Sequence, residues 1–129
     1  MDYSRLFLML GAAGGGTAVV LGAFAAHGLR GRLDAALLHA FETAVTYQFF
    51  HSIALCVLGV WCRQFVRQPE FGDAAVVSGL LFSLGIVLFC GSLYALTFGA
   101  PRWVGPITPL GGIAFIGGWV ALLVSAWRS

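Results

Sequence analysis

The sequence contains no lysine, and charged residues of both signs make up only 9 % of its 129 residues. Soluble domains contain roughly 25 % charged residues. Seven arginines and five acidic residues are too few to cover the surface of a soluble protein of this length, so the composition excludes one. With no lysine and a net charge of +2, the chain also has no polybasic segment that would bind nucleic acid or anionic lipid.

Hydrophobic residues make up 60 % of the sequence and are concentrated in four long runs. About 20 apolar residues are enough for a helix to cross the hydrocarbon core of a bilayer. The runs are too long for barrel strands and do not alternate, and short connections favour antiparallel neighbours. The sequence therefore predicts an all-α, polytopic membrane protein, a single domain 1–129 with four transmembrane helices in an antiparallel up-down bundle. The expected spans are about 6–26, 36–62, 74–98 and 108–127.

Three local patterns predict where these helices begin and end. Asp34 is expected to be an N-cap for the second span. Gly99, followed by Pro101, is expected at the position just past the end of the third. Thr108 and Pro109 form an N-cap and first-turn pair for the fourth. We expect the first span to be retained, because its apolar stretch is longer than that of a signal peptide.

The arginines predict an orientation through a small bias. Four lie on the side of the N-terminus and three on the opposite side, and cytoplasmic loops carry the arginine excess. We expect both termini in the cytoplasm. The first set is Arg5, Arg63, Arg67 and Arg128, and the second is Arg30, Arg32 and Arg102.

Small residues recur at helical spacing in the first and fourth runs. Glycine or alanine at four-residue intervals lets helices approach closely, which drives helix association in lipid. We assign this packing role to Gly14, Gly22 and Gly118, with the partner helix in the same chain or in a second copy. The three cysteines lack a redox or metal spacing and are interpreted as inert thiols.

The polar residues of the runs lie mainly in one half of the membrane. At 1.5 Å of rise per residue, His51 lies near the midplane, and the others extend from it toward the non-cytoplasmic boundary. Polar groups inside a membrane generally face a bundle interior or a wet cavity. The sequence predicts a polar vestibule open to the non-cytoplasmic side. Its candidate ligand-binding residues are His27, Glu42, Tyr47, Gln48, His51, Ser92, Tyr94 and Thr108.

Structural explanations for these residues remain open at this point. Glu42, near the headgroups, fits a clamp to a basic neighbour, and His51 fits a packing residue with internal hydrogen bonds. The two histidines of the second span, His39 and His51, are twelve residues apart with no thiolate between them, so we predict no metal site. No nucleophile is available for a catalytic triad, so we assign no catalytic residue and no cofactor.

Four ordered segments carry a resemblance that covers nearly the whole chain. They resemble the signatures of the small membrane proteins named domain of unknown function 423, which are related to transmembrane protein 256. The resemblance implies a bacterial inner-membrane protein with four helices and implies no activity. The segments are GAFAAHGL at 22–29, FETAVTYQFFH at 41–51, FCGSLY at 89–94 and ITPLGG at 107–112.

Two functional hypotheses follow, and the sequence favours a non-enzymatic role for both. The first is a small binding or transport module whose vestibule accepts a small amphipathic molecule or a proton, with Glu42 and His51 as titratable groups. The alternative is a structural partner that assembles with another membrane protein, or with a second copy, through its glycine-rich helix faces. An intramembrane enzyme or haem protein using the histidines has the least support.

Overall fold

The computed structural model describes residues 2–64 and 69–129, without the side chains of 69–71. Arg67, which the orientation prediction counts, lies outside this part. The elements, in order, are α1 (Tyr3–Phe24), the π-helical turn η1 (Ala25–Leu29), α2 (Ala35–Cys62), α3 (Pro69–Gly85), a second π-helical turn η3 (Ile86–Cys90), α4 (Gly91–Thr97), the short 3-10 helix η4 (Arg102–Val104) and α5 (Ile107–Arg128).

Four helical stretches are long and apolar enough to cross a membrane. They run over Tyr3–Leu29, Ala35–Cys62, Gly72–Thr97 and Arg102–Arg128. The third is continuous through α3, η3 and α4, and the described residues include no strand. The predicted all-α class with four membrane-length helices is confirmed.

The first two helices begin at aspartates whose side chains satisfy free N–H groups. The Asp2 carboxylate accepts hydrogen bonds from the Ser4 hydroxyl at 2.9 Å and from the Ser4 backbone N–H at 3.1 Å. The hydroxyl, helped by backbone N–H groups, holds the pKa of Asp2 below its ordinary value. Asp34 accepts from the Leu37 N–H at 2.8 Å, which is the predicted N-cap.

One of the two predictions for the other helix ends is confirmed and one is wrong. Gly99 follows the C-cap Phe98 with a φ of 93°, a conformation that favours glycine. Thr108, in contrast, does not cap α5, because the helix already begins at Ile107. The Thr108 hydroxyl is hydrogen-bonded to the Ser92 hydroxyl of α4 and is therefore engaged with a neighbouring helix.

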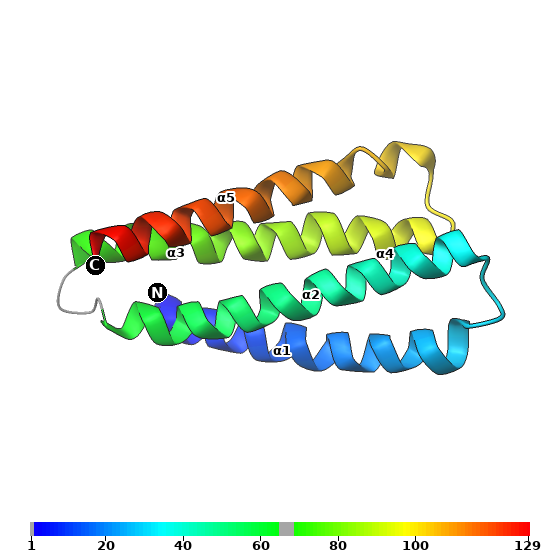
Figure 1. Ribbon diagram of the computed structural model, residues 1–129, viewed down its shortest axis with the longest axis horizontal. Helices are drawn as coiled ribbons and strands as arrows, with labels where there is room; N and C mark the ends of the chain where they lie inside the picture. The colour runs from blue at the N-terminus through cyan, green and yellow to red at the C-terminus, as the bar shows by residue number, and fades with distance from the viewer. Residues whose placement is uncertain (1, 65–68) are drawn as a thin grey trace.

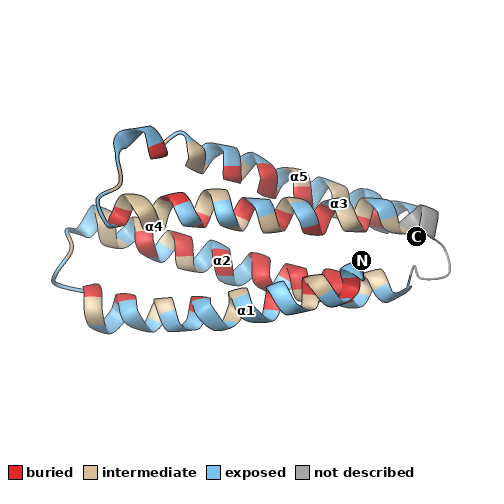
Figure 2. Cartoon of the chain, turned by 180° about the vertical axis from the view of Figure 1, so that it is seen from behind, coloured by how far each residue is buried: buried red, intermediate tan, exposed pale blue. Residues whose placement is uncertain are grey.

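The helices form two antiparallel hairpins that lie side by side (Figure 1). α1 packs on α2, α5 packs on α3, and the hairpins meet mainly where α2 contacts α3, η3 and α4. Both termini lie at the same end of the bundle (Figure 1). The buried residues of α1 lie on its side toward α2, and its other residues are intermediate or exposed (Figure 2). The main core contains Phe7, Leu55, Leu58, Phe82 and Phe115.

The predicted packing glycines all face helices of the same chain. A Cβ at Gly14 would collide with the Ser52 hydroxyl of α2, and one at Gly118 would come within 2.5 Å of the Phe82 ring of α3. Gly22 is less tightly packed, since its Cβ would lie 3.4 Å from Val45. These glycines bring α1 against α2 and α5 against α3, so their close contacts are within each hairpin.

Candidate functional site

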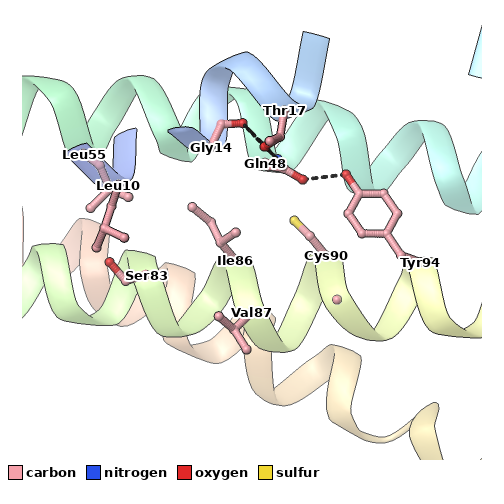
Figure 3. Close-up of a pocket in the computed structure, with 11 residues that line it drawn as sticks. Leu10, Gly14, Thr17, Gln48, Leu55, Ser83, Ile86, Val87, Cys90 and Tyr94 are labelled. Atoms are coloured by element: carbon pink, nitrogen blue, oxygen red, sulfur yellow. Dashed lines mark hydrogen bonds between the residues drawn. The ribbon is translucent and has the colours of Figure 1, made fainter. Parts of the chain in front are cut away.

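A cavity of about 330 Å³ lies between the two hairpins, near the middle of the helices (Figure 3). α1 forms one wall, the α3–η3–α4 helix forms the opposite wall, and α2 forms the floor. The mouth is on the side of the bundle, because Leu10 and Val87 in its walls are 40 % and 68 % exposed. In a membrane this mouth faces the lipid chains. The lining residues are Leu10, Gly14, Thr17, Gln48, Leu55, Ser83, Ile86, Val87, Cys90, Gly91 and Tyr94.

Gln48 is the polar centre of this cavity and joins three helices. Its side-chain amide donates to the Gly14 carbonyl at 2.9 Å and to the Thr17 hydroxyl at 2.8 Å, both on α1. Its amide oxygen accepts from the Tyr94 hydroxyl of α4 at 2.7 Å (Figure 3). Gln48 is only 6 % exposed, so its side-chain amide is buried, and both its amide nitrogen and its amide oxygen have hydrogen-bond partners. The network places a fixed polar group inside a mainly apolar cavity.

Thr17 belongs to this site but was missed by the sequence analysis. It is the only residue with a polar side chain in the run 6–26. Its hydroxyl donates to the Ala13 carbonyl at 2.8 Å, so it faces Gln48 as an acceptor. The signal that identifies it is this isolation, since a single hydroxyl in an apolar span generally faces another polar group.

His51 lies in a different environment, on the side of α2 that faces α5. Its Nδ1 lies 2.7 Å from the Tyr47 carbonyl and therefore carries the proton, while its Nε2 accepts from the Trp119 indole N–H at 3.2 Å. The ring stacks on Phe115 with a centroid separation of 3.7 Å. Both ring nitrogens are thus used within the bundle, and the imidazole is held as the neutral tautomer. Trp119 and Phe115 are members of this cluster that sequence reasoning did not identify.

Tyr47 and the Ser92–Thr108 pair lie on the same side of the bundle as His51. The Tyr47 ring packs 4.6 Å from that of Phe89, and its side chain is 42 % exposed. Ser92 also donates to the Phe89 carbonyl at 3.0 Å, and its contact with Thr108 ties α4 to the first turn of α5. None of Tyr47, Ser92 and Thr108 is among the residues that line the cavity.

The two candidates at the membrane boundary, His27 and Glu42, are exposed. Within the described residues, neither side chain forms a hydrogen bond or an ion pair. No group of three or more histidine, cysteine or acidic residues in the described ranges could hold a metal ion. The candidate residues therefore separate into the cavity pair Gln48 and Tyr94, the cluster facing α5, and these two surface residues.

The comparisons with known proteins identify the family. A family model described as "Protein of unknown function (DUF423)" matches residues 21–112. The chain belongs to this family. The match includes Gln48, His51 and Tyr94, whereas Thr17 and Trp119 lie outside it. The resemblance inferred from the four sequence segments is confirmed.

Relatives of the DUF423 family match this chain over nearly its full length. A UPF0382 membrane protein of Staphylococcus aureus is 38 % identical over 124 residues, covering 96 % of this chain and 97 % of the relative. The UPF0382 membrane protein YwdK of Bacillus subtilis is 41 % identical over 95 % of this chain and 96 % of its own length. A UPF0382 membrane protein of Haemophilus influenzae is 41 % identical over 95 % of this chain and 94 % of its own length. No solved structure gives a significant match. Because these relatives are named membrane proteins and four helices are long and apolar enough to cross a membrane, the protein is a membrane protein.

Proposed function

We propose that this protein binds one small amphipathic molecule, taken from the lipid phase into the cavity between its hairpins. The observation that carries the proposal is the hydrogen-bonded Gln48–Tyr94 pair inside an apolar cavity of about 330 Å³. Sites for small molecules are typically apolar cavities of roughly 300–1,000 Å³ with a few fixed polar groups. A polar network alone would stabilise the bundle, but the adjoining cavity is more than packing needs.

The proposal retains the binding role from the binding-or-transport hypothesis, but it places the entrance of the binding site on the side of the bundle and not at its non-cytoplasmic end. The sequence favoured a vestibule at the non-cytoplasmic end, whereas the cavity opens between the exposed side chains of Leu10 and Val87. Glu42 and His51, the groups that would couple transport to protons, do not line it. We place the protein in the bacterial inner membrane with both termini in the cytoplasm, as the arginine bias and the resemblance suggest.

The assembly alternative has less support from these contacts. Gly14 and Gly118, two of the glycines expected to pack against a partner, are already in close contact with Ser52 and Phe82 of the same chain. Enlarging either residue would disturb the hairpin itself, so a lost complex would not identify an interface. We therefore give binding precedence over assembly.

One glycine offers a position from which a larger side chain can fill the cavity, and a second glycine offers a control. Gly91 lines the cavity, and a Cβ there would meet nothing within 4 Å. Gly16 on α1 is equally open but does not line the cavity, so Gly16→Phe is the matched control. Purified variants would be irradiated with dodecanol carrying a diazirine, and the labelled peptides identified by mass spectrometry.

We expect Gly91→Phe to abolish most labelling of the cavity walls, because its ring occupies the space the probe needs. The Gly16→Phe protein should be labelled like the wild type. Equal labelling of the cavity peptides in both variants would refute the proposed binding site.

A further inference from the structure

The polar side chains that line the cavity have already used their strong hydrogen-bond donors. Both amide hydrogens of Gln48 are directed at α1, to the Gly14 carbonyl and the Thr17 hydroxyl. The Tyr94 hydroxyl donates to Gln48 at 2.7 Å. Thr17 donates to the Ala13 carbonyl, and Ser83 donates to the Gly79 carbonyl, each at 2.8 Å. Among these side chains only acceptor capacity is left.

The unused capacity can be assigned atom by atom. A carbonyl or hydroxyl oxygen has two lone pairs. The Gln48 Oε1 and the Thr17 oxygen each accept one hydrogen bond already and can accept one more, whereas the Tyr94 and Ser83 oxygens accept none from the described residues and can accept from a ligand. The helical backbone adds no donors, because its N–H groups are bonded along the helix. Among the described lining residues, the remaining side-chain donor is the Cys90 thiol, which is weak. The cavity therefore offers acceptors to a ligand.

We infer that the cavity selects an apolar molecule that carries a neutral hydrogen-bond donor, an alcohol or phenol hydroxyl. This inference rests on the proposed function and defines the class of its ligand. None of the described residues that line the cavity is charged, so an ammonium or carboxylate headgroup would be buried without a counter-charge from them. A hydroxyl placed at Gln48 and Tyr94 satisfies an acceptor, whereas an ether or ketone oxygen there faces only other acceptors.

Competition between two similar molecules tests the inference. Labelling of the purified full-length protein by diazirine dodecanol is measured against unlabelled dodecanol and against dodecyl methyl ether, at equal mole fractions in the detergent. The molecules have closely similar apolar bodies and differ at the hydroxyl hydrogen. We expect dodecanol to compete about tenfold more strongly, which corresponds to about 1.4 kcal/mol, or one hydrogen bond.

Two variants should change this preference in opposite directions. In Tyr94→Phe, the Gln48 oxygen loses its internal donor and becomes a stronger acceptor for the ligand, so the preference for dodecanol should rise severalfold. In Gln48→Met, the Tyr94 hydroxyl loses its acceptor and can donate to the ether, so the preference should fall toward equality. Tyr94→Phe keeps the hydrogen bonds from Gln48 to α1, so it remains informative if Gln48→Met does not fold.

The outcomes separate the inference from the proposed function. Equal competition by alcohol and ether, with labelling that Gly91→Phe still abolishes, would overturn the donor preference and leave the binding site standing. Labelling that Gly91→Phe does not affect would overturn both. A tenfold preference that shifts upward in Tyr94→Phe supports the inference.

Discussion

Buried serines show how this bundle uses single hydroxyl groups. Ser78 donates to the Gly118 carbonyl of α5 at 2.7 Å, and Ser125 accepts from the Trp61 indole at 3.2 Å. Ser52 is equally buried, but its hydroxyl has no hydrogen-bond partner among the described residues. It lies directly against Gly14, where α1 and α2 are in close contact. Similar residues therefore contribute differently to stability.

Alanine substitutions at these serines should have effects of opposite sign. Ser52→Ala removes a hydroxyl that is buried without a partner, so the free energy of unfolding should rise by about 1 kcal/mol. Ser78→Ala breaks a bond between helices and should lower it by about 0.6 kcal/mol, the average for such bonds in a membrane. Reversible unfolding in mixed micelles measures both. A decrease in both variants would contradict the assignment of Ser52.

The third membrane-length stretch shows how one helix can form both a cavity wall and an interface. Its π-helical turn, Ile86–Cys90, places Ile86, Val87 and Cys90 on the cavity wall. On the other side of the helix, a Cβ at Gly111 of α5 would collide with the backbone of Phe89. π-helical turns are rare and occur frequently at functional sites. Here the absence of a side chain at Gly111 lets α5 approach the turn.

Neighbouring glycines on α5 provide a test of this contact. Gly111→Ala should lower the free energy of unfolding by about 1–3 kcal/mol, because a backbone contact cannot relax as a flexible side chain does. At Gly112 a Cβ would lie 3.9 Å from the Phe89 ring, an ordinary contact. Gly112→Ala should therefore be neutral or stabilising and measures the helix-propensity gain. Equal stability of the two variants would show that Gly111 is not needed for close packing.

At the scale of the whole molecule, the sequence was enough to predict the class and the number of membrane-length helices. Long apolar runs and short connections leave few other arrangements in lipid. It was not enough to predict which helix face meets which neighbour, because apolar residues are suited both to the core and to lipid. Gln48 and His51 are three residues apart on α2, yet one bonds Thr17 of α1 and the other Trp119 of α5. Their similar depth in the membrane led to the prediction that both line one vestibule. Their different directions around the helix axis instead place Gln48 against α1 and His51 against α5.

The predicted orientation of the bundle rests on the arginine balance and can be tested with reporters. Both termini lie at the same end (Figure 1), so one C-terminal fusion reports on the whole bundle. We expect a C-terminal green fluorescent protein to fluoresce and a C-terminal alkaline phosphatase to be inactive, because cytoplasmic loops retain the arginine excess. Phosphatase inserted at Gly31, in the connection between the first two spans, should be active.

Removing arginines tests the cause of this orientation. The bias is four to three, so the double variant Arg63→Ala and Arg128→Ala leaves two arginines against three and should move part of the population to the opposite orientation. The matched control, Arg30→Ala with Arg32→Ala, leaves four against one and should keep the phosphatase at the C-terminus inactive. An unchanged reporter pattern in the first variant would mean that the helices, and not the arginines, determine the orientation. The side-facing cavity would still open to the lipid chains in either orientation.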